Sequence, residues 1–205
     1  MFQVRHLKSG IKKTMSSRER ILGRINKHRP TAVQRKVIKI ESEQGINLRG
    51  QFEVSLKKVG GKIISIQSVK DWKKWVKITY GTDIYLYSEI DALEGNYLLD
   101  SGINKNQLNK IDVAVLEGEF GIAENGAIWV EKFAFRAIPF VTQHLILILR
   151  ESNIISNMHE AYTELAEFDL PDFGVFISGP SKTADIEQSL VYGAHGPKTL
   201  TVILV

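Results

Sequence analysis

The sequence has no cysteine, few prolines and no long apolar run, and each absence excludes a class of protein. Its 205 residues include no Cys, 5 Pro and 3 Met. Without cysteine the chain forms no disulfide and offers no ligand for a cysteine-bound zinc ion or iron–sulfur cluster. The longest apolar run, Leu145–Leu149, is far shorter than the roughly 18–20 residues that span a bilayer. Because the N-terminus also lacks the apolar stretch of a secretory signal, we expect a cytoplasmic protein.

Positive charge is concentrated in the N-terminal part of the chain. Residues 1–40 hold 12 Lys or Arg and one acid, Glu19, whereas residues 41–205 hold 15 Lys or Arg and 22 acids. The two parts carry charges of +11 and −7, which account for the net charge of +4. Such a basic arm can bind nucleic acid, an acidic partner or the acidic body of the same chain, or it can be a solvated helix. No nucleic-acid readout motif follows it, so nucleic acid is not the expected partner.

Hydrophobic periodicity predicts a short helix in the basic arm and an α/β domain after it. Ser16 and Glu19 form a capping box, which predicts a helix at about 16–29. Residues 1–47 are therefore predicted to be a basic arm with this helix and a linker, and residues 48–205 to be one α/β domain.

Helical and strand patterns alternate along this domain. The predicted helices cover 48–59, 69–80, 158–166 and 183–192. The predicted strands cover 62–66, 83–87, 112–116, 121–130 with a break at Gly126, 145–149, 173–178 and 199–205. Strands that consist of unbroken apolar residues are buried on both faces. This is typical of a mostly parallel sheet with helices on both faces.

One segment has the arrangement of a ligand site. The strand 173–178 is followed by a short loop and by the predicted helix 183–192, whose free N–H groups could bind a phosphate or carboxylate. Asp185 and Glu187 would repel such an anion, so either they point away or the ligand presents hydroxyl groups or a cation to them. The alternative is that this segment is an ordinary capped helix and not a ligand site. The predicted ligand-binding residues are Ser178, Gly179, Ser181, Lys182, Thr183, Asp185 and Glu187.

Histidines offer two further predictions. His195 lies in a turn where an imidazole can titrate near neutral pH, so it is a candidate for proton transfer, with a helix-capping role as the alternative. His144 begins an apolar strand and is interpreted as a histidine that is satisfied within the core.

Two long segments resemble the LUD-domain family, and within it the lactate-utilization C type. They run from Ile177 to Glu187, as ISGPSKTADIE, and from Gly193 to Lys198, as GAHGPK. The segment FGIAENG at 120–126, with Pro139 and His144 after it, is similar to another family motif. The resemblance covers about residues 48–205.

The resemblance implies a fold and a functional role. It implies a three-layer α/β fold resembling the ribose-phosphate isomerase and CoA-transferase-like superfamily, in which a glutamate can act as nucleophile or base; Glu124 occupies the matching motif. It also implies an accessory subunit without clusters or other cofactors, which acts with iron–sulfur subunits in oxidising L-lactate to pyruvate and binds a small anionic ligand or those partners.

Two other functions remain open at this point. The chain could be an independent enzyme of isomerase, CoA-transferase or nucleotide-dependent ligase type, which is an argument from fold alone. It could also be a nucleic-acid-associated regulator that uses the basic arm, and its binding would then depend steeply on salt.

Overall fold

The computed structural model describes residues 16–29, 47–100, 102, 104–167, 173–184, 190–193 and 195–205. The chain divides into two units, residues 1–39 and 40–205, and we describe each by itself. Among the helices of the described residues, none combines the length and apolarity needed to cross a bilayer.

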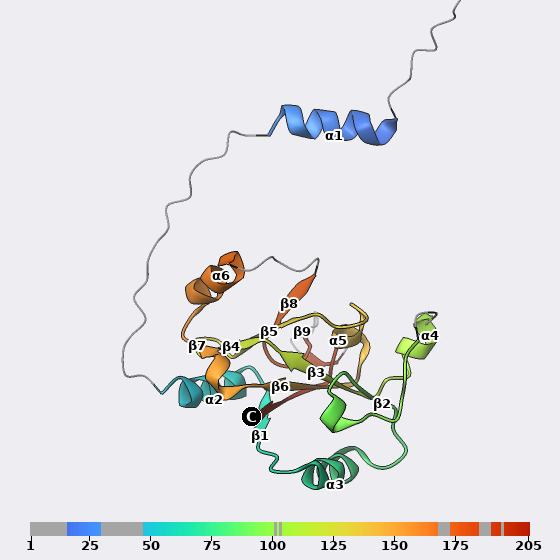
Figure 1. Cartoon of the computed structure of the whole chain (residues 1–205), viewed down its shortest axis with the longest axis vertical. Coiled ribbons are helices and arrows are strands. Elements are labelled where there is room, and N and C mark those ends of the chain that lie inside the picture. Colours follow the sequence, from blue (N-terminus) through green and yellow to red (C-terminus); the bar gives the residue numbers. More distant parts are fainter. Residues whose placement is uncertain are drawn as a thin grey trace, which may run out of the picture. The chain divides into compact units, whose positions relative to one another are not determined.

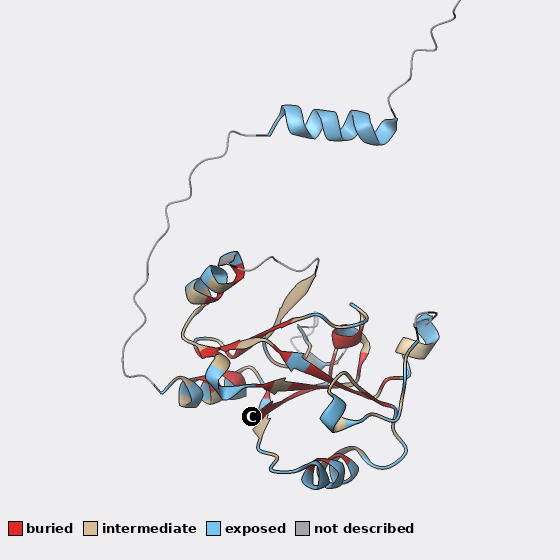
Figure 2. Cartoon of the chain, in the orientation of Figure 1, coloured by how far each residue is buried: buried red, intermediate tan, exposed pale blue. Residues whose placement is uncertain are grey.

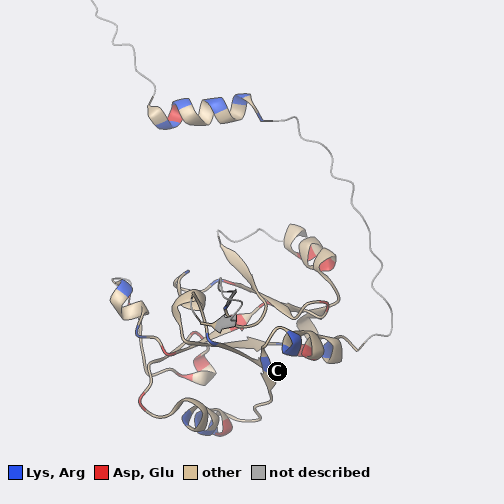
Figure 3. Ribbon diagram, turned by 180° about the vertical axis from the view of Figure 1, so that it is seen from behind, with Lys and Arg blue, Asp and Glu red and all other residues tan. Residues whose placement is uncertain are grey.

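The first unit contains helix α1 (Ser17–Lys27). The predicted capping box is confirmed, because the Ser16 hydroxyl accepts a hydrogen bond from the Glu19 amide and the Glu19 carboxylate accepts one from the Ser16 amide. The helix has no buried residue, and its Lys and Arg residues outnumber its acidic ones (Figure 3).

A parallel sheet forms the centre of the second unit (Figure 1). The strand order is β1-β11-β6-β3-β2, and each neighbouring pair is parallel, as the apolar runs predict. Its strands are β1 (Lys62–Ile64), β11 (Thr199–Leu204), β6 (His144–Leu149), β3 (Val113–Gly118) and β2 (Leu86–Ser88).

Helices cover both faces of this sheet. Helix α3 packs Trp72 and Val76 against one face, and helix α2 packs Phe52 and Leu56 against the other, where Ile138 of α5 also lies. Most of the strand residues between them are buried (Figure 2). The predicted three-layer α/β fold is therefore confirmed. The helices of this unit are α2 (Leu48–Lys58), α3 (Val69–Tyr80), α4 (Lys105–Leu108), α5 (Ile138–Val141) and α6 (Met158–Glu167), with 3-10 turns at Asp91–Leu93 and Glu151–Asn153.

A second sheet, which the sequence did not predict as a separate layer, shares the face with α2 and α5. Its order is β7-β4-β5-β8, with β4 and β8 both antiparallel to β5. Ile128 and Val130 of β5 join the core beneath the parallel sheet, and Ala161 of α6 packs on the residues of β4 and β5 that face the other way. Its strands are β7 (Ile154–Ile155), β4 (Phe120–Ile122), β5 (Ala127–Glu131) and β8 (Gly174–Ile177).

Two predictions of local structure are corrected. The strand predicted at 121–130 with a break at Gly126 is two strands, the antiparallel hairpin β4–β5, which turns at Gly126 with φ of +68°. The helix predicted at 183–192 is wrong, because β9 (Lys182–Ala184) pairs antiparallel with β10 (Leu190–Tyr192). The helix N-terminus proposed as an anion site is therefore not present.

Candidate functional site

An open pocket of about 750 Å³ lies where the parallel strands begin. Its lining includes residues that start or precede all five strands, from Lys62 at β1 to Asp83 before β2. Because α3 returns the chain to this amino edge of the sheet, its last turns supply a wall with Trp75 and Tyr80. This volume falls in the range of about 300–1,000 Å³ that drug-sized ligands occupy.

Aromatic rings and hydroxyl groups form the middle of the pocket. The rings of Tyr80 and His144 lie 4.8 Å apart, and Nδ1 of His144 is 2.8 Å from the hydroxyl of Thr199. Burial, and then the nearby Lys198 ammonium, lower the pKa of His144, while Asp112 acts in the opposite direction. Burial raises the pKa of the Tyr80 phenol, although hydrogen bonds with threonine hydroxyls offset part of this. Both rings are therefore uncharged at neutral pH.

The charged side chains of the pocket change sign along the sheet edge. Lys62 begins β1 and Lys198 precedes β11, at one side of the sheet. Asp112 precedes β3 and Asp83 precedes β2, at the other side. With His144 on β6 between them, the pocket has a basic end, a neutral middle and an acidic end.

Some of the residues predicted from the sequence lie around the β4–β5 turn. The Ser178 hydroxyl donates to the backbone carbonyl of Asn125 at 3.0 Å, so the loop after β8 contacts the turn that carries Glu124. The Glu124 carboxylate is exposed and accepts the backbone N–H of Met158 at 3.0 Å. This bond attaches the start of α6 to the turn, which is a structural use of the carboxylate.

Other predicted residues lie where two loops meet beside β11. The Ser181 amide donates to the carbonyl of Pro197 at 2.8 Å, and the Gly193 amide donates to the Ser181 carbonyl at 3.1 Å. Lys182 and His195 are exposed. These loops come directly before Lys198, so the family motif borders the pocket without lining most of it. Asp185 and Glu187 lie outside the described residues, and the Thr183 side chain is likewise not described.

Gly179 fixes the approach of this loop to the end of α2. Its φ is +81°, and a Cβ at this position would overlap the backbone carbonyl of Val59. We expect Gly179→Ala to lower the free energy of unfolding by about 1–3 kcal/mol, because it combines a left-handed backbone with a backbone clash. Urea denaturation of the purified variant measures this loss.

Gly81 provides the matched control. Its φ is +92°, but a Cβ at this position would have no atom of the described residues within 4 Å. Gly81→Ala therefore reports backbone strain alone, and equal losses for the two variants would contradict the role given to the Val59 contact.

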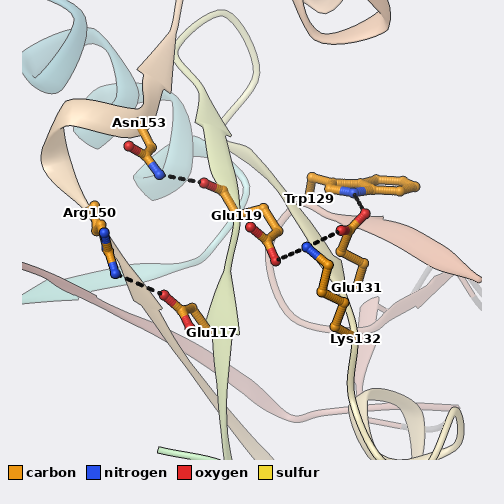
Figure 4. Close-up of polar contacts among 7 residues, drawn as sticks. All are labelled: Glu117, Glu119, Trp129, Glu131, Lys132, Arg150 and Asn153. Atoms are coloured by element: carbon orange, nitrogen blue, oxygen red, sulfur yellow. Dashed lines mark hydrogen bonds and ion pairs between the residues drawn. The ribbon is translucent and has the colours of Figure 1, made fainter. Parts of the chain in front are cut away.

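The opposite, carboxyl edge of the sheet carries ion pairs. Glu117 on β3 pairs with Arg150 after β6 at 3.8 Å, and Lys132 pairs with Glu119 at 3.2 Å and Glu131 at 2.8 Å (Figure 4). The carboxylates Glu117, Glu119 and Glu131 thus each have a basic partner. This arrangement favours a structural role for these carboxylates over that of a free catalytic base.

Sequence reasoning missed the amino-edge pocket and interpreted His144 only as a core residue. The available pattern was the recurrence of a polar residue at or before the start of successive predicted strands, as at Lys62, Asp112, His144 and Thr199. Open α/β sheets usually bind ligands at the carboxyl edge, so the sequence prediction placed the site after a strand rather than before one.

Comparisons with known proteins agree on one family. The LUD domain matches residues 85–205. Lactate utilization protein C of Oceanobacillus iheyensis is 29% identical over 136 residues, covering 62% of this chain and 58% of the relative. Lactate utilization protein C of Shouchella clausii is 31% identical over 112 residues, covering 52% and 49%. The chain thus spans about half the length of the curated relatives it matches.

A solved structure supports the fold. A DUF162 family protein from Deinococcus radiodurans superposes with a TM-score of 0.55 at 17% identity, covering 77% of this chain and 96% of that one. Its similarity concerns the α/β architecture alone. Because the family match extends over more than half of the residues, the chain belongs to the LUD domain family.

Proposed function

We propose that this protein acts in lactate utilization, as an accessory subunit that works with iron–sulfur subunits oxidising L-lactate to pyruvate. The observation that carries the proposal is the match to proteins named lactate utilization protein C, within a chain that belongs to the LUD domain family. The sequence has no cysteine for a cluster of its own, so electron transfer through clusters would belong to partners.

The exposed loops beside β11 are the surface we assign to partners or to a small anion. Ser178, Lys182 and His195 are exposed there, while backbone hydrogen bonds between Ser181, Gly193 and Pro197 fix the loops. Fixed loops with exposed polar side chains suit binding, since little conformational entropy is lost on association. In this proposal His195 and Glu124 carry any proton transfer.

A lysate assay tests the proposed function. A strain of the source organism that lacks this chain is expected to lose L-lactate-dependent dye reduction, and the purified chain added back restores it. The purified chain alone is expected to show no turnover of lactate. Pyruvate-dependent growth of the same strain serves as the control and stays unchanged.

Three results would count against the proposal. Full lactate-dependent reduction in the deletion strain would remove the chain from the pathway. Turnover of lactate by the isolated chain would instead support an independent enzyme. If the double variant Ser181→Ala, His195→Ala restored activity to the wild-type level, the loops beside β11 would not be the functional site.

A further inference from the structure

The amino-edge pocket has two ends of opposite charge that lie several strands apart. Neighbouring strands are spaced by about 4.8 Å, so two to three spacings, or roughly 10–14 Å, separate the strands of Lys198 and Lys62 from that of Asp112. A three-carbon acid is too short to reach both ends. The pocket therefore suits an elongated ligand with different chemistry at its two ends.

The basic end suits a phosphate group. Lys62 and Lys198 lie on or before neighbouring strands and both line the pocket. Burial, and then the Lys198 ammonium, lower the pKa of the His144 imidazole on the next strand, which agrees with a positive charge at this end of the pocket. Two ammonium groups with no carboxylate among the pocket residues of β1 and β11 favour an anion at this end.

The acidic end suits hydrogen-bond donors. One carboxylate oxygen of Asp112 accepts the Tyr85 amide at 2.8 Å, which fixes the side chain. Helix α3 ends close by at Tyr80, and its C-terminal carbonyl groups add partial negative charge. An exocyclic amino group or a hydroxyl group is favoured here, whereas a second anion is repelled.

The middle of the pocket offers rings. Trp75 and Tyr80 meet edge to face with centroids 5.5 Å apart, and Tyr80 also contacts the uncharged His144 ring. Threonine hydroxyls on β11 lie beside these rings. Such a surface favours contact with a sugar or with a planar heterocycle.

We propose that this pocket binds a nucleoside monophosphate, with its phosphate at Lys62 and Lys198 and its base directed toward Asp112. Such a ligand has a phosphate at one end, a ribose in the middle and an amino-bearing base at the other end. The basic, neutral and acidic groups of the pocket follow one another in the same order along the sheet edge. The pocket meets the loop surface of the proposed function at Lys198, but nucleotide binding there does not depend on that function.

Calorimetric titration of the full chain with adenosine 5′-monophosphate tests the proposal. The nucleotide is expected to bind more tightly than ribose 5-phosphate, adenosine or inorganic phosphate, each of which lacks part of the ligand. The double variant Lys62→Ala, Lys198→Ala is expected to weaken binding at least about tenfold, since two charge-assisted contacts are lost.

Two further variants make the test specific. Lys73→Ala with Lys77→Ala removes the same charge from α3 outside this pocket and is expected to leave the affinity unchanged. Asp112→Asn keeps an acceptor for the Tyr85 amide and is expected to weaken binding of the nucleotide but not of inorganic phosphate. Equal affinities for nucleotide and phosphate, equal effects of the two lysine pairs, or no nucleotide binding at millimolar concentration would each overturn the proposal.

Discussion

Deleting Thr201–Val205 is expected to leave the chain unable to fold. These residues include most of β11, which pairs with β1 on one side and β6 on the other. Three of them, Val202, Ile203 and Leu204, have apolar side chains that are 0%, 2% and 8% exposed. At about 1.5–3 kcal/mol for each buried side chain, their removal costs about as much as the whole stability of a typical domain, roughly 5–15 kcal/mol. Two strands would also lose their backbone partner.

The deletion is measured by expression, solubility and circular dichroism. We expect insoluble protein, or soluble protein without the native spectrum. Removing Val205 alone is the matched control, since its side chain is 63% exposed and it lies beyond β11. A soluble five-residue deletion with native circular dichroism would refute the central position assigned to β11.

Trp72→Ala is expected to lower the free energy of unfolding by about 3–5 kcal/mol, because it leaves a large cavity under α3. The Trp72 side chain is 1% exposed and packs with Val113, Val115 and Ile146 of the parallel sheet. Since α3 also carries the aromatic wall of the pocket, loosening it is expected to weaken ligand binding as well. Thermal and urea unfolding measure the stability.

Ile78→Ala is the control on the same helix. Its side chain is 73% exposed, so the change is expected to stay within about 0.5 kcal/mol of the wild type. If Trp72→Ala were equally mild, α3 would not be held on the sheet through this residue.

The elements that the sequence predicted well are those whose pattern lies within one segment. Helix α3 was predicted with its observed bounds, because apolar residues recur at helical spacing and Gly81 follows the last of them. The apolar runs of β6 and β11 likewise predicted a parallel sheet. The segment 183–192 was predicted wrongly, since strands of three residues such as β9 and β10 are too short to show a two-residue period.

The candidate site was predictable only in part. The loops Ser178–Lys182 and Gly193–Lys198 were identified as continuous motifs, and backbone hydrogen bonds at Ser181 bring them together. The amino-edge pocket could not be identified in this way, because its residues are distributed over five strand starts. Placing Lys62, His144 and Asp112 in one row requires the strand order, which depends on packing between distant segments.

The pairing of β1 with β11 also bears on the rate of folding. Lys62 lies opposite Thr201, so β1 and β11 can pair only when residues separated by most of the chain come into contact. Contacts between residues so distant in sequence are slow to form, because the loop between them loses entropy before the contact contributes. The basic end of the pocket, where Lys62 and Lys198 come together, is therefore expected to be among the last parts to form, and among the first to be lost when β1 detaches from the sheet edge.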